Sequence, residues 1–133
     1  MNIYLSSRYS RMNELRGYAE EIRKINPELV VNSRWLKGDH VLDAGSSLTV
    51  DEQNCRFAEE DVEDVTNADM LVFFSCDPKT PGRGGRHVEF GIAVALGIPI
   101  AVVGPKENVF HDLPEVEQFD SFKEFEQYLL RLG

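Results

Sequence analysis

A glutamate that follows a glycine-rich loop is the first candidate for chemistry in this sequence. The loop is 81–85, and Glu89 lies shortly after it in a segment with helical spacing. Glycines let backbone N–H groups approach a ligand closely, and a helix N-terminus favours negative charge. We expect Glu89 to lie in the first helical turn, where the helix dipole keeps it ionised, as a nucleophile must be. The alternative is a plain turn followed by a glutamate that only complements the helix start.

Asp61 and Tyr4 are the candidate partners of this carboxylate. Asp61 lies four residues from both Phe57 and Val65, which places it on or beside the buried side of an amphipathic helix. Burial raises the pKa of a carboxyl group, and a raised pKa suits a proton donor to a leaving group. Tyr4 lies on the first expected strand, where its hydroxyl would reach a carboxylate. The alternatives are a boundary carboxylate with a hydrogen-bond partner and a tyrosine that only fills the core.

Polar and aromatic residues around the same positions are candidates for substrate binding. Trp35 follows the second expected strand, where an exposed indole would stack on a base. Four arginines would cluster near the site and hold a phosphate or another anion, although each of them also fits a solvated surface position. They are Arg8, Arg11, Arg83 and Arg86. The candidate substrate-binding residues are Ser6, Ser7, Arg8, Trp35, Arg83, Gly85 and Arg86.

Alternating strands and helices must position these side chains. Apolar runs predict strands at 2–6, 29–33, 70–75 and 98–103, and a short edge strand at 116–119. Amphipathic spacing predicts helices at 10–24, 51–68 and 88–96, and a C-terminal helix at 122–132. The expected buried stripe of the second helix consists of Phe57, Ala58, Val62 and Val65. We therefore predict one α/β domain over 1–133, with a flavodoxin-like (Rossmann-like) five-stranded parallel sheet, order 2-1-3-4-5, and helices on both faces.

The edge of this sheet where the strands end is the expected place of the site. In an open parallel sheet, ligands bind outside the carboxyl ends of the strands, near the point where the strand order reverses. This rule selects the segments 6–11, 32–36, 75–89 and 104–110. The longest loop, 34–48, is expected to be a binding loop or a lid.

Composition excludes several classes of function. The net charge of −9 argues against a broad nucleic-acid or anionic-membrane surface, because such surfaces are basic. A Walker A loop is absent, and no GxGxxG follows the first strand, which disfavours nucleoside triphosphate hydrolysis and dinucleotide redox chemistry. The two cysteines form no CxxC and are expected to be free thiols. With no signal-peptide pattern, we expect a soluble, cytoplasmic protein that uses no metal or cofactor and acts on a small molecule.

The order and spacing of the candidate residues resemble the nucleoside 2-deoxyribosyltransferase family, which includes the 2'-deoxynucleoside 5'-monophosphate N-hydrolases. The similarity covers most of 2–103 and rests on three elements. They are the opening Ile3-Tyr4-Leu5-Ser6, the pair Asp61 and Asp69, and a Glu-x-Gly-x-Ala-x-x-x-Gly-x-Pro pattern from Glu89 to Pro99.

The resemblance implies a role for each candidate in cleaving the bond between a base and a sugar. Glu89 would attack C1' of the sugar, Asp61 would contact the base and help to protonate it, and Tyr4 would orient Glu89. The chemistry would resemble that of a retaining glycosidase, with water or a second base as the acceptor of the sugar. The resemblance also implies a homo-oligomer, a dimer or larger, with sites near the interface.

One departure from the family pattern concerns the phosphate. The transferases usually carry an aspartate six residues before the nucleophile, where this chain has Arg83. The monophosphate hydrolases hold the 5'-phosphate with this loop, and Arg83 and Arg86 fit that use. We therefore expect an N-hydrolase of a (2'-deoxy)nucleoside 5'-monophosphate or nucleoside. The alternatives are a base-exchanging transferase and a non-catalytic nucleotide-binding module. A phosphoribohydrolase with a Pro-Gly-Gly-x-Gly-Thr loop is disfavoured, because the threonine is missing.

Overall fold

The computed structural model describes residues 1–76 and 82–132 and contains one parallel sheet of five strands. The strand order is β2-β1-β3-β4-β5, and all four neighbouring pairs are parallel, which confirms the predicted flavodoxin-like fold. The strands are β1 (Asn2–Ser6), β2 (Val30–Val31), β3 (Met70–Phe74), β4 (Ile100–Val103) and β5 (Val116–Phe119). The helices are α1 (Met12–Ile25), α2 (Val50–Thr66), α3 (Gly85–Leu96) and α4 (Phe122–Leu132).

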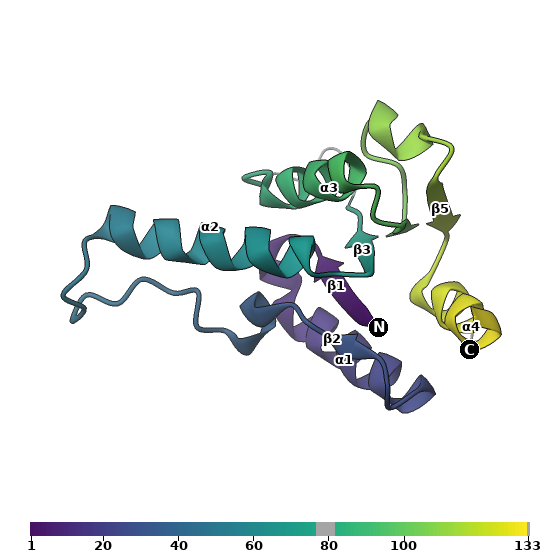
Figure 1. Cartoon of the computed structure of the whole chain (residues 1–133), viewed down its shortest axis with the longest axis horizontal. Helices are drawn as coiled ribbons and strands as arrows, with labels where there is room; N and C mark the ends of the chain where they lie inside the picture. The colour runs from purple at the N-terminus through teal and green to yellow at the C-terminus, as the bar shows by residue number, and fades with distance from the viewer. Residues whose placement is uncertain (77–81, 133) are drawn as a thin grey trace.

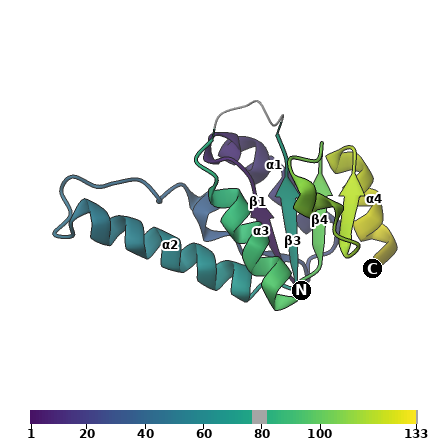
Figure 2. The ribbon, with the colours of Figure 1, turned by 90° about the horizontal axis from the view of Figure 1, so that it is seen from above.

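Helices cover both faces of the sheet, as Figures 1 and 2 show. α1 and α4 contact each other on one face, and α2 and α3 contact each other on the other. The residues of β3 and β4 are therefore buried throughout, and these strands are continuous apolar runs. Within the described residues no helix combines the length and the apolar character needed to cross a bilayer. Both cysteines are free.

The edge strand β2 is shorter than the predicted 29–33. The backbone N–H of Asn32 still donates to the carbonyl of Ile3 on β1 at 3.1 Å, and beyond that bond a side chain replaces the backbone pairing. The Asn32 side chain donates to the carbonyl of Asp64 at 2.9 Å, and Ser33 Oγ accepts the N–H of Leu5 at 2.7 Å. The chain then turns into a short 3-10 helix, η2 (Arg34–Lys37). This turn directs the following loop away from the sheet and toward α2.

Helix α2 begins at a capping box in which Thr49 and Glu52 bond to each other's backbone N–H. Its N-terminal part and the preceding loop project beyond the sheet in Figure 1. The predicted buried stripe is only partly correct: Val65 is buried and Phe57 is half-buried, whereas Ala58 and Val62 are exposed. The expected stripe failed because much of the helix has no strand beneath it.

Helix α3 begins after Gly84, which has a φ of 85°, and ends at the predicted C-cap, Gly97, with a φ of 70°. Its inner face packs on the sheet through Phe90 and Ala93, which are buried. Its start at Gly85 puts Glu89 in the second turn, and the prediction of a first-turn glutamate was wrong. The predicted turn segment 77–85 lies in part, at 77–81, outside the described residues.

Candidate active site

Both oxygens of the Glu89 carboxylate are held by side chains of β1. The Tyr4 hydroxyl donates to Oε2, and the Ser6 hydroxyl donates to Oε1 at 2.7 Å. Residues two apart on a strand point to the same face, which explains how Tyr4 and Ser6 reach one carboxylate together. Tyr4 and Ser6 are both fully buried. The two donors fix the orientation of Glu89 at the end of the sheet.

This carboxylate opens onto a pocket of about 370 Å³ beside the ends of β1 and β3, where the strand order reverses. Asp61 of α2 lines the same pocket, so the structure brings both candidate carboxylates to one cavity. Six of the seven predicted binding residues also line it, and the seventh, Ser6, contacts Glu89 instead. The lining residues are Ser7, Arg8, Tyr9, Ser10, Trp35, His40, Asp61, Gly82, Arg83, Gly84, Gly85, Arg86 and Glu89.

The electrostatics of the pocket raise the pKa of both carboxyl groups. Burial, and then the charge of Glu89, raises the pKa of Asp61 to about 7, while His40 acts in the opposite direction. This confirms the predicted direction for Asp61. Burial also raises the pKa of Glu89 to about 7, against the lowering effect of the bonds from Tyr4 and Ser6. Burial and the charge of Glu89 raise the pKa of Tyr4 well above its usual value.

The expectation that the helix dipole keeps Glu89 ionised was therefore wrong about the dominant effect. A dipole contributes about 0.3–1 kcal/mol near a helix start, and its effect falls off within the first turn. Glu89 lies beyond that turn, and burial dominates its pKa. Ionised Glu89 depends instead on the two hydroxyl donors of β1.

Trp35 lines the pocket, but the predicted exposed indole was wrong. The residue is only 5% exposed, and its Nε1–H donates to the carbonyl of Leu5 at 2.9 Å. The indole is thus bound to β1 and forms part of the pocket wall. Tyr9, which is 48% exposed, lies next to it with the ring centroids 6.1 Å apart. Tyr9 is thus the exposed aromatic side chain in the lining of this pocket.

The four arginines have different surroundings. Arg83 is exposed, and Arg8 is partly buried near Gly82. Arg11 donates to the carbonyl of Ser75 at 2.9 Å, which ties the start of α1 to the end of β3. Arg86 is buried and forms an ion pair with Glu107.

Sequence reasoning missed the partner of Arg86 and one histidine of the pocket. Arg86 Nη2 lies 2.6 Å from Glu107 Oε1, and Glu107 also accepts the N–H of Cys76 at 3.2 Å. Arg86 and Glu107 are 21 residues apart, and their pair ties α3 to the segment after β4, while the bond from Cys76 ties that segment to the end of β3. No local pattern indicates these contacts. His40 lies in the loop that was expected to bind a ligand, and this loop assignment was the only available signal for it.

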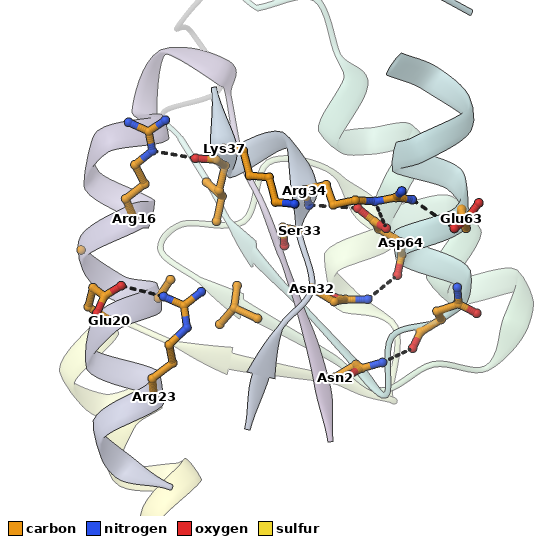
Figure 3. Close-up of a pocket in the computed structure, with 15 residues that line it drawn as sticks. Asn2, Arg16, Glu20, Arg23, Asn32, Ser33, Arg34, Lys37, Glu63 and Asp64 are labelled. Carbon is orange, nitrogen blue, oxygen red and sulfur yellow. Dashed lines mark hydrogen bonds and ion pairs between the residues drawn. The ribbon is translucent and has the colours of Figure 1, made fainter. Parts of the chain in front are cut away.

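Within the described residues, no three His, Cys, Asp or Glu side chains lie close enough together to hold a metal ion. A second and larger groove of about 760 Å³ lies outside β2, between α1 and α2 (Figure 3). Its arginines already have partners: Arg34 pairs with Asp64, Arg23 with Glu20, and Arg16 donates to the carbonyl of Leu36. Asp61, Glu89 and six of the seven predicted binding residues line the smaller pocket.

Comparison with known proteins supports the fold. No protein-family model and no curated protein matches the chain by sequence. A 2-deoxyribosyltransferase from Bacillus psychrosaccharolyticus has a similar structure, with a TM-score of 0.71 and 19% identity over 96% of this chain and 92% of that one. The CMP N-glycosidase BcmB of Clostridium botulinum has a TM-score of 0.58 and 18% identity, and the similarity covers 100% of both chains. A conserved protein from Enterococcus faecalis V583 has a TM-score of 0.61 and 18% identity, over 100% of this chain and 87% of that one.

These neighbours agree with the family resemblance that the sequence motifs predict. Two of them carry the names of a deoxyribosyl transferase and of a nucleotide N-glycosidase. At 18–19% identity, the likeness establishes a shared fold.

Proposed function

We propose that this protein is an enzyme that cleaves the N-glycosidic bond of a (2'-deoxy)nucleoside 5'-monophosphate or nucleoside and passes the sugar to water through an intermediate on Glu89. One observation carries the proposal: a carboxylate held through both oxygens by Tyr4 and Ser6 shares a pocket with Asp61, whose pKa is raised to about 7. The names of two structural neighbours support the same class of reaction.

The hydrogen bonds assign one proton to this pair of carboxyl groups. Tyr4 and Ser6 both donate to Glu89, which favours its ionised form. Asp61 Oδ1 is buried and has no hydrogen-bond partner among the described residues, which favours a protonated Asp61. The reactive state is therefore Glu89 as carboxylate and Asp61 as acid, and the two groups titrate as a pair.

From this state, the reaction follows in two balanced steps. In the first, Glu89 forms a bond to C1' while the bond from C1' to the base nitrogen breaks, and the base takes the proton of Asp61. In the second, water attacks C1', Asp61 takes a proton from that water, and Glu89 leaves as a carboxylate. Asp61 is thereby protonated again, and the enzyme returns to its starting state.

The start of α3 is our proposed binding site for the 5'-phosphate. Among the described residues no side chain caps this helix, whose N-terminal N–H groups are suited to an anion. Arg8, Arg83, Gly85 and Arg86 line the pocket beside it. Because Arg86 is paired with Glu107, we assign the main charge contact with the phosphate to Arg83 and Arg8.

A panel of substrates tests this function. Purified protein would be incubated with the common ribo- and deoxyribonucleosides and their 5'-monophosphates, with and without a free acceptor base, and the products separated by chromatography. We expect release of a free base from monophosphates without an acceptor. Product that requires an acceptor base would replace the hydrolase with a base-exchanging transferase. Tight binding of nucleotides without any cleavage would show a non-catalytic binding module.

We also propose that the chain forms a homodimer through the outer faces of α2 and α3. Val62 of α2 and Val88 and Leu96 of α3 are exposed, at 46%, 63% and 54%. Exposed apolar side chains on two helices that contact each other support an interface on this side of the molecule. Sedimentation at increasing concentration would measure the state, and Val88→Lys should shift it toward the monomer. A wild-type protein that is monomeric at 100-fold dilution and at high concentration alike would refute the dimer.

A further inference from the structure

His40 is a pocket residue to which the proposed reaction gives no role so far. Its side chain is only 7% exposed, although it comes from a loop. The imidazole stacks on Phe57 of α2, with the ring centroids 4.8 Å apart and the planes 19° apart. It lines the same pocket as Asp61 and Glu89. The stacking holds a ring whose N–H can donate a hydrogen bond beside the proposed acid.

The polar atoms of His40 and Asp61 face each other without a completed hydrogen bond. His40 Nδ1 lies 3.7 Å from Asp61 Oδ1, and His40 Nε2 lies 3.6 Å from Glu60 Oε2. His40 Nε2 and Asp61 Oδ1 are both buried and have no hydrogen-bond partner among the described residues. A buried polar atom without a partner costs about 1–3 kcal/mol. Catalytic hydrogen bonds are often long without substrate and shorten when it binds.

We propose that His40 is a positioning residue that donates its Nδ1–H to Asp61 Oδ1 when substrate is bound. This inference rests on the proposed function. The bond leaves Oδ2 of Asp61 to carry the proton that the departing base takes. His40 keeps its own proton throughout, and its N–H stabilises the carboxylate that Asp61 becomes in the first step. Asp61 Oδ1 has no other hydrogen-bond partner among the described residues, and His40 Nδ1 lies 3.7 Å from it.

The charges around this pair explain why a neutral or positive donor is needed there. Glu60 and Asp64 lie on the same helix as Asp61, and Glu89 approaches from α3. The Tyr4 hydroxyl of β1 already donates its hydrogen bond to Glu89. Arg34 of η2 forms ion pairs with Glu60 and Asp64. Without His40, a newly ionised Asp61 would therefore face mainly negative charge.

Three variants of His40 test the proposal. His40→Phe keeps a ring that stacks on Phe57 but removes both nitrogens, and His40→Gln keeps an N–H donor. His40→Leu is a second variant without a donor, should His40→Phe not fold, and thermal melts check each protein. We expect His40→Phe to lower kcat for a 5'-monophosphate about 10- to 100-fold with little change in KM, because the effect lies in proton transfer. His40→Gln should recover part of this loss.

A double-mutant cycle with Asp61→Asn separates positioning from a structural role. If His40 acts through Asp61, His40→Phe should have little further effect in the Asp61→Asn background. Glu63→Gln is the matched control, because Glu63 lies on the same helix outside the pocket and should leave kcat unchanged.

The outcomes distinguish the two proposals. If His40→Phe lowers kcat by the same factor in the wild type and in the Asp61→Asn background, the role of His40 is overturned. The proposed function would remain intact. A wild-type protein that cleaves no nucleoside or nucleotide would overturn the proposed function, and the role of His40 with it.

Discussion

Replacing Glu89 with glutamine should stabilise the protein at neutral and alkaline pH and have little effect at acidic pH. The pKa of Glu89 rises from 4.5 to about 7 on folding, chiefly because of burial. The folded chain therefore holds a proton that the unfolded chain has lost across this window. Stability contributed by the protonated group is complete below pH 4.5 and is lost as the pH rises to about 7.

The size of this loss follows from the same two values. Each pH unit in the window corresponds to about 1.4 kcal/mol, so ionised Glu89 lowers the free energy of unfolding by about 3 kcal/mol above pH 7. Glutamine remains neutral, and its carbonyl still accepts the bond from Tyr4 while its NH₂ group donates to Ser6. The pKa of Asp61 should also fall, because the charge of Glu89 is the second cause of its rise.

Urea unfolding at pH 4.5 and at pH 8 measures this difference. We expect Glu89→Gln to match the wild type within about 1 kcal/mol at pH 4.5 and to exceed it by about 3 kcal/mol at pH 8. Glu117→Gln is the control, because Glu117 is exposed on β5. A Glu89→Gln protein whose advantage is the same at both pH values would refute the assignment of a raised pKa to Glu89.

Three further predictions concern the residues around Glu89. Tyr4→Phe removes a hydrogen bond to the Glu89 carboxylate that is worth about 1.5–3 kcal/mol. The pKa of Glu89 should rise, and the acidic limb of the kcat/KM profile should move about one to two pH units higher. An unmoved limb would contradict the role of Tyr4. Arg83→Ala should raise KM for monophosphates about 10- to 100-fold but leave KM for nucleosides unchanged in steady-state kinetics; equal effects on both would remove the phosphate contact. Glu107→Gln leaves buried Arg86 without its charge partner and should lower the free energy of unfolding in urea by about 3–5 kcal/mol; a loss below about 1 kcal/mol would show that the pair is not structural.

Much of the fold could be predicted because the central strands are continuous apolar runs. The run at 70–75 corresponds to β3, and 98–103 to β4, since burial on both faces requires apolar residues at every position. The extent of β2 could not be predicted, because it depends on the contacts of Asn32 and Ser33 with distant parts of the chain.

The candidate site shows the same division between local and long-range information. The spacing of Asp61 on its helix indicated a partly buried carboxylate with a raised pKa, and the structure agrees. The burial of Trp35 depends on a bond to Leu5, 30 residues away, and could not be read from the residues around it. The dominance of burial over the helix dipole at Glu89 likewise depends on the packing of α3 against β1.

The most direct test of a glycosyl intermediate on Glu89 is mass spectrometry of the trapped enzyme. A 2'-fluoro nucleoside 5'-monophosphate should slow both steps by destabilising the positive charge that builds at C1', and with a good leaving base the intermediate should accumulate. We predict that the intact protein gains the mass of one fluorinated sugar phosphate, and that digestion locates this mass on the peptide containing Glu89. Glu89→Ala should show no adduct and should lose several orders of magnitude in kcat while remaining folded. An adduct on another residue, or an active Glu89→Ala protein, would contradict the mechanism.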